Sequence, residues 1–160
     1  MNLATVTWWW PVAARHLDWC RAMMAAADDA LTGSIGTAWP DRARAELDNV
    51  RKAEDWGLAT GRAADALDLA WRSANFMQFW GLAEQCADWL ARGLEATRDA
   101  PPSVDRARAL VRAGDMFATC GRWSRAREYF EASLALGIEL GDPARRAIAL
   151  LSLADADCAQ

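Results

Sequence analysis

Histidine, tyrosine and closely spaced cysteines, from which metal sites and many catalytic sites are built, are scarce in this chain. Its 160 residues include one histidine, His16, one tyrosine and four cysteines, and no two cysteines form a CxxC pair. A structural zinc site needs four Cys or His ligands, usually in pairs at short spacing. We therefore expect no metal and no cofactor. Scattered cysteines in an alanine-rich chain are typical of buried thiols in a reducing compartment, so we expect a cytoplasmic protein.

Long apolar runs and a surplus of positive charge are missing as well. No apolar stretch approaches the roughly 20 residues that cross a bilayer. The stretch 3–14 has no Lys or Arg before it, as a signal peptide would require. The 18 basic and 22 acidic side chains are interleaved and give a net charge of −4, whereas a nucleic-acid-binding protein should show a basic face. We expect neither a membrane segment nor direct contact with nucleic acid.

The abundant residues favour helix. Alanine, leucine and arginine are frequent, and β-branched residues are few. Ala, Leu and Arg are among the residues with the highest helix propensity. A chain of this length can bury one core without a second domain. The composition therefore predicts a single all-α domain over residues 1–160.

Small and apolar residues recur along the chain at an interval of forty. The series Ala70, Ala74, Met77, Gly81, Leu90 and Leu94 returns as Leu110, Gly114, Phe117, Gly121, Phe130 and Leu134, and begins again weakly at Leu150. A constant offset predicts stacked copies of one helix-turn-helix unit. Such units bury their apolar faces only against their neighbours, and the array presents an extended surface to a partner.

Proline, glycine and capping residues divide the chain into about seven antiparallel helices. We expect helices over about 11–31, 39–60, 63–80, 82–97, 103–119, 124–140 and 143–160, with a break at 32–38. Ser103 or Asp105, Ser124 and Asp142 are the expected caps. This division gives a tryptophan-rich segment 1–14, an N-terminal hairpin 15–60 and forty-residue repeats over 63–160, the last incomplete. The hairpin is either a degenerate repeat or a capping unit.

The repeat carries a tetratricopeptide-like pattern in Leu110, Ala113, Gly114, Phe117, Ala126, Phe130 and Ser133. Its length of forty residues, with the segments 15–20, 46–51, 79–80, 89–90 and 131–136 and Gly61, resembles a particular family region. This is the helical-repeat region of large bacterial regulators of the antibiotic-regulatory, maltose-regulator and LuxR types, which join a nucleotide-binding switch domain to a DNA-binding domain. The likeness covers about 15–160 and implies a right-handed, tetratricopeptide-like α-α superhelix.

Two parts of those regulators are missing from the sequence. It contains no GxxxxGK[ST] phosphate-binding loop and no basic helix-turn-helix. The resemblance therefore implies only the sensor and scaffold part, a non-catalytic module for protein interaction or signal sensing in a transcription-regulator-like protein. The alternative is a receptor whose pocket, lined by Trp71, Phe79 and Trp80, binds a small molecule. No catalytic constellation supports an enzyme.

Tetratricopeptide-like arrays bind partners on the concave face formed by the first helix of each pair. The motif assigns to this face Trp71, Arg72, Asn75, Gln78, Phe79, Arg108, Arg112, Asp115, Thr119, Ser152 and Asp155. Their arginines would hold an extended acidic or polar segment through charge-assisted hydrogen bonds, with Trp71 and Phe79 as apolar anchors. The alternative is a solvated face with ordinary ion pairs.

Three other features allow more than one interpretation. His16 and Cys20 stand four apart on a helix, the spacing of a nucleophile pair, but no orienting acid is evident, which favours simple packing. Trp8–Trp10 is either a seam for a partner or homodimer, or a segment folded over the first helix or left from an upstream domain. The helix 143–160 has no following partner, so either the chain continues or this helix packs against another chain.

Overall fold

The computed structural model describes residues 9–32 and 39–158, and all regular structure in these ranges is helical. It has eight α-helices: α1 (Trp10–Thr32), α2 (Trp39–Ala45), α3 (Leu47–Ala59), α4 (Ala63–Phe79), α5 (Ala83–Ala96), α6 (Val104–Thr119), α7 (Trp123–Glu139) and α8 (Pro143–Cys158). Within these ranges, none of the helices is both long enough and apolar enough to cross a membrane.

The prediction of a single helix over 39–60 is wrong, because the chain breaks at Glu46 between α2 and α3. Glu46 has φ −95° and ψ 1°, and its N–H reaches back only to the Ala43 carbonyl, at 3.3 Å. Its carboxylate accepts a hydrogen bond from the Asn49 amide at 2.6 Å. The Glu46 side chain is thus tied to the first turn of α3, a local competition that helical periodicity does not reveal.

The other predicted boundaries agree with the structure to within a few residues. The cap at Ser103 is confirmed, since its hydroxyl accepts from the Arg106 N–H at 3.2 Å. The cap at Asp142 is confirmed by its carboxylate, which accepts from the Arg145 N–H at 3.0 Å. Ser124 is not a cap, because α7 already begins at Trp123, directly after a glycine turn. Most of the predicted break at 32–38 lies outside the described residues.

Four of the connections between helices are one kind of glycine turn. Gly61, Gly81, Gly121 and Gly141 have φ between 63° and 79°, and they recur at multiples of twenty residues. The N–H after each glycine bonds to the carbonyl five residues earlier, as Leu82 does to Met77 at 2.7 Å. This Schellman arrangement satisfies the last carbonyls of one helix and sends the next back alongside it. Between α5 and α6, where the interval would place another glycine, the chain has Pro101 instead.

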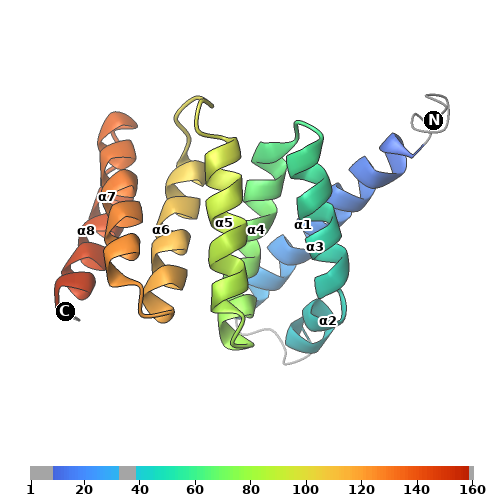
Figure 1. Ribbon diagram of the computed structural model, residues 1–160, viewed down its shortest axis with the longest axis horizontal. Coiled ribbons are helices and arrows are strands. Elements are labelled where there is room, and N and C mark those ends of the chain that lie inside the picture. The colour runs from blue at the N-terminus through green and yellow to red at the C-terminus, as the bar shows by residue number, and fades with distance from the viewer. Residues whose placement is uncertain (1–8, 33–38, 159–160) are drawn as a thin grey trace.

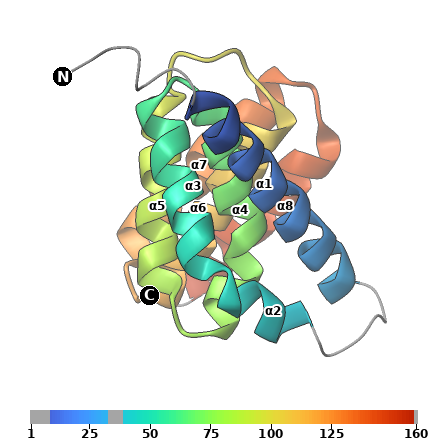
Figure 2. The same ribbon diagram turned by 90° about the vertical axis from the view of Figure 1, so that its right-hand side faces the viewer.

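Successive helices from α3 to α8 pack antiparallel in chain order (Figure 1), with α1 and α8 toward opposite ends. α4 also packs against α1 and α6, and α6 packs against α8. Because of these contacts α1, α4, α6 and α8 form one layer, with α3, α5 and α7 alternating beside them. α1 crosses α3 and α4 at an incline (Figure 2) and occupies the place beside α4 that α4 occupies beside α6. α1 is therefore the member of this layer at the N-terminal end of the described residues.

One continuous core joins these layers. Its largest buried side chains include Leu17 of α1, Phe76 of α4, Leu90 of α5 and Met116 of α6. The same apolar cluster extends to Ala156 of α8. The described residues therefore fold around one core.

Candidate binding groove

Trp71 of α4 lies where α4 packs against α6. Its side chain is 8% exposed, and the guanidinium carbons of Arg72 and Arg108 lie 4.5 Å and 5.5 Å from its ring centroid. Two cations, one from α4 and one from α6, therefore contact one indole in cation–π geometry. The indole Nε1 is buried and has no hydrogen-bond partner among the described residues.

Beside Trp71, α6 and α8 enclose a hollow of about 280 Å³. It is lined by Trp71, Arg108, Val111, Arg112, Asp115, Arg145, Ile148 and Ser152. Five residues of the predicted face, Trp71, Arg108, Arg112, Asp115 and Ser152, thus converge on one space. Sequence reasoning missed Arg145 and Ile148, although they stand seven and four residues before Ser152, on its face of the helix.

The hollow is lined by three arginines and one carboxylate. Arg108 pairs with Asp105 at 3.0 Å, Arg112 with Asp115 at 3.5 Å, and Arg145 with Asp142 at 4.0 Å. Each of these pairs spans three residues and is partly exposed, so each contributes little stability. Burial raises the pKa of Asp115, a shift that the nearby Arg112 opposes. The lining is therefore rich in positive charge held by weak local pairs.

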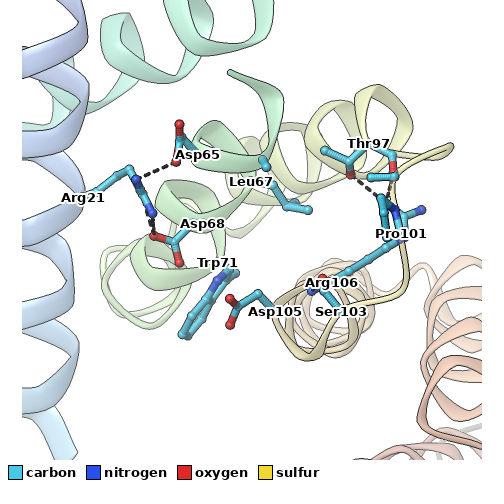
Figure 3. A pocket seen from close by; sticks show the side chains of 12 residues that line it. Arg21, Asp65, Leu67, Asp68, Trp71, Thr97, Pro101, Ser103, Asp105 and Arg106 are labelled. Carbon is cyan, nitrogen blue, oxygen red and sulfur yellow. Dashed lines mark hydrogen bonds and ion pairs between the residues drawn. The ribbon is translucent and has the colours of Figure 1, made fainter. Parts of the chain in front are cut away.

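Two further hollows extend this space along the same layer. One, of about 370 Å³, shares Asp115 and Ser152 with it and adds Asp155, Gln78 and Thr119, the last two joined by a 3.0 Å hydrogen bond. The other, of about 200 Å³, shares Trp71 and lies between α4 and the start of α6 (Figure 3). We call the three hollows together the α4–α6–α8 groove.

At the end of the groove near α1, the charged side chains of the lining pair with one another. Arg21 lies 2.6 Å from Asp65 and 2.9 Å from Asp68 (Figure 3). Asp68 also accepts from Arg72 at 2.8 Å. Across this hollow Arg106 donates to the carbonyl and hydroxyl oxygens of Thr97. These charges hold α1, α4, α5 and α6 together and leave the arginines of the central hollow as the more available cations.

The remaining predicted residues lie apart from the central hollow. Asn75 donates to Asp28 of α1 at 2.6 Å. Phe79 is the last residue of α4 and is 77% exposed. Trp80 packs against Phe76, with ring centroids 5.7 Å apart. Trp71 lines two of the hollows described here, and neither Phe79 nor Trp80 lines either of them. The three aromatic residues proposed for one pocket therefore do not come together in these hollows.

A separate apolar hollow of about 540 Å³ lies between α1 and α3. It is lined by Trp9, Val12, Ala13, His16, Asn49, Lys52 and Trp56. Trp10 packs edge-on against Trp56 at 5.7 Å between centroids, so this member of the tryptophan trio is folded against α3. Trp8 lies outside the described residues.

His16 and Cys20 do come together, with Nε2 and Sγ 3.7 Å apart. Cys20 is fully buried, and burial raises the pKa of its thiol to about 11. The His16 ring stacks on Trp19, at 6.3 Å between centroids. A thiol with this pKa is protonated at neutral pH, which suits packing and not nucleophilic attack.

Metal-binding groups do not cluster in the part of the chain that the structure describes: no three His, Cys, Asp or Glu side chains could hold one ion. The central hollow is thus lined by three arginines, one partly buried aspartate and an indole, with a few other side chains. Comparison of the chain with protein-family models, with curated proteins and with solved structures finds no match.

Proposed function

We propose that this chain is a tetratricopeptide-like, right-handed repeat module that binds an extended acidic segment of a protein partner in the α4–α6–α8 groove. It would serve as the non-catalytic interaction or signal-sensing part of a cytoplasmic, transcription-regulator-like protein. Its four free cysteines suit a reducing compartment. The forty-residue recurrence and the alternating helix layers support the repeat assignment.

The observation that carries the proposal is the convergence of Arg108, Arg112 and Arg145 on one hollow beside Trp71. Their present partners are aspartates of their own helix or its cap, held at 3.0 Å to 4.0 Å. Carboxylates of a bound segment could replace these pairs at low cost, because weak exposed pairs have little stability to lose. Charge-assisted hydrogen bonds to arginine also favour planar carboxylates.

The shape of the site favours an extended ligand. Its three hollows are linked through Trp71, Asp115 and Ser152, so a chain can cross from α4 to α8. An acidic side chain would lie near the arginines, and an apolar one could lie on Val111 and Ile148. The Trp71 ring would anchor the segment beside them, since buried aromatic and arginine side chains contribute most at interfaces.

The test measures fluorescence anisotropy of labelled peptides that alternate Asp or Glu with Leu, against peptides in which Lys replaces the acids. We expect the acidic peptides to bind and their affinity to fall as salt is raised. The double variant R108A/R112A should weaken binding at least about tenfold, because each charge-assisted hydrogen bond contributes about 1.5–3 kcal/mol.

The matched control is Arg51→Ala. Arg51 forms the same kind of pair, to Asp48 three residues earlier at 3.7 Å, but it lies on α3, away from the groove. Helicity should be unchanged in both variants. Equal binding of acidic and basic peptides would contradict the proposal, as would equal effects of the Arg51 and Arg108/Arg112 variants.

The alternative function, binding of a small apolar molecule, has support at a different place from the predicted one. The hollow between α1 and α3 combines Trp9, Trp56 and Val12 with few polar groups. Its probe is 1-anilinonaphthalene-8-sulfonate, whose fluorescence rises in apolar sites. Val12→Glu places a charge at a side chain that is 41% exposed and should abolish a specific signal, whereas an unchanged signal would exclude this hollow.

A further inference from the structure

The outer face of α8 is apolar and open. Leu150 and Leu151 are 52% and 67% exposed, and Ala147 and Ala154 beside them are exposed as well. The four residues follow one another at steps of three, one and three, so they form one face of the helix. We call them the α8 face.

The corresponding residues of the earlier repeats are interior residues. Forty positions before Leu150 and Leu151 stand Leu110 and Val111 of α6, which are only 6% and 9% exposed. Forty positions before Ala147 stands Ala107, which is fully buried. In α6 the following helices α7 and α8 pack against the helix. The α8 face therefore has the composition of a surface that packs against another helix.

The sequence of α8 is nearly symmetric about its centre. Leu150 and Leu151 flank the midpoint, Ala147 and Ala154 lie equally far from it, and so do two residues of opposite charge, Arg146 and Asp155. Arg146 and Asp155 are both exposed and form no ion pair with another described residue. In an antiparallel pair about a two-fold axis, Ala147 of each copy would lie opposite Ala154 of the other, and Leu150 and Leu151 would each lie beside their own counterparts.

Charge selects this orientation over the parallel one. The first half of α8 carries Arg145 and Arg146, and the second half carries Asp155 and Asp157. Antiparallel helices would bring the basic half of each copy beside the acidic half of the other, whereas parallel helices would bring like charges together. The paired alanines would allow close approach of the two axes.

We propose that a second copy of this chain packs its α8 antiparallel against the α8 face, about a two-fold axis near Leu150 and Leu151. An isologous interface uses the same surface on both copies, and a pattern symmetric about its own centre meets that requirement. The apolar residues of the α8 face line none of the three hollows of the groove, so dimer formation is tested separately from peptide binding.

The first test is sedimentation velocity of the full chain from low to high micromolar concentration. The wild-type chain should be a dimer in the upper part of this range. Leu151→Glu would bury a charge in the apolar seam and should raise the dimer dissociation constant at least about a hundredfold. The control Val104→Glu changes an apolar residue of α6 that is 38% exposed and should leave the dimer intact.

The second test exchanges the charges. In an antiparallel pair the flank of α8 that carries Arg146 faces the same flank of the other copy, where Asp157, which also pairs with Arg127 of α7, lies at nearly the same height. R146E alone and D157R alone should each weaken the dimer, because each places like charges across the seam. The double variant R146E/D157R restores opposite charges there and should recover the wild-type affinity. Circular dichroism checks that every variant keeps its helicity.

Three results would overturn the proposal. A wild-type chain that stays monomeric throughout would leave the α8 face to a following helix of a longer chain. A Leu151→Glu variant as dimeric as the wild type would place the interface elsewhere. A double charge variant no better than the single ones would exclude the antiparallel orientation.

Discussion

The ring of Phe130 in α7 lies directly over the backbone of Gly114 in α6, where a β-carbon would stand only 2.7 Å from the ring Cζ. Forty residues earlier the corresponding pair is Ala74 in α4 and Leu90 in α5, both fully buried. The larger ring of Phe130 thus accompanies the smaller residue Gly114, and the smaller side chain of Leu90 accompanies the larger residue Ala74. We infer that the two pairs fill equivalent positions between packed helices in different ways.

This relationship predicts the outcome of a double-mutant cycle. Gly114→Ala should lower the free energy of unfolding by about 1–3 kcal/mol, because its methyl group overlaps the Phe130 ring. Phe130→Leu should also destabilise the protein, through the space that it leaves. The double variant G114A/F130L recreates the Ala74–Leu90 pair and should be more stable than the sum of the single losses by at least about 1 kcal/mol. Urea denaturation of the four proteins measures the coupling, and additive losses would disprove it.

A second prediction concerns Glu54 of α3, whose side chain is fully buried. Neither carboxylate oxygen has a hydrogen-bond partner among the described residues, and the nearest cation, Arg92, is 3.7 Å away. Burial raises the pKa of Glu54 to about 7, against the opposing effect of Arg92. The folded state therefore holds this proton more tightly than the unfolded state does.

The sign of the pH dependence follows from this difference. Between the unfolded pKa of 4.5 and the folded pKa of about 7, the folded state binds more protons, so its stability falls as the pH rises through this window. Glu54→Gln should remove that fall and be more stable than the wild type at pH 8, by up to roughly 3 kcal/mol. The two proteins should be similar near pH 5. Thermal denaturation across this range measures the effect.

The control for Glu54 is its neighbour Asp55. Asp55 is half exposed and pairs with the same Arg92 at 2.7 Å. Asp55→Asn should retain most of the pH dependence, because the buried carboxyl that causes it is still present. Parallel pH profiles for the wild type and Glu54→Gln would show that Glu54 is not the titrating group.

Local signals in the sequence predicted most helix boundaries. Contacts between helices could not be predicted from those signals. Ser103, Asp142 and the turn glycines act within one turn of their own position, so their roles are readable from neighbouring residues. The break at Glu46 depends on a side-chain hydrogen bond that competes with the helix. The tetratricopeptide-like motif assigned Trp71, Arg108, Arg112 and Asp115 to one face, and all four line the central hollow.

The rest of the site depends on distances between elements. The bond from Asn75 to Asp28 joins residues far apart in the chain, and no repeat pattern relates them. Arg145 joins the central hollow only because α8 packs against α6. In the sequence Glu54 is an ordinary acidic residue next to Asp55, and only the packing of α3 against other helices makes one carboxyl buried and the other exposed.

The turn glycines lead to a third prediction. Gly121 has φ +71°, and a β-carbon there would meet nothing within 4 Å, so only the backbone conformation opposes a side chain. Gly121→Ala should therefore cost about 1–2 kcal/mol of unfolding free energy. Gly121→Asn should cost less, since asparagine tolerates this conformation better. Equal stability of Gly121→Ala and the wild type in urea denaturation would contradict the constraint.

The last prediction concerns the chemistry of Cys20 beside His16. Because Cys20 is fully buried and its pKa is raised to about 11, iodoacetamide should modify it at pH 8 only when the fold opens. Its rate of modification, followed by mass spectrometry of the proteolysed chain, should be slower than that of a small-molecule thiol and should rise with urea. His16→Gln should leave this rate unchanged unless it destabilises the fold, which urea denaturation would reveal. A Cys20 that reacts faster than the small thiol, and slows on His16 substitution, would instead establish an activated nucleophile pair.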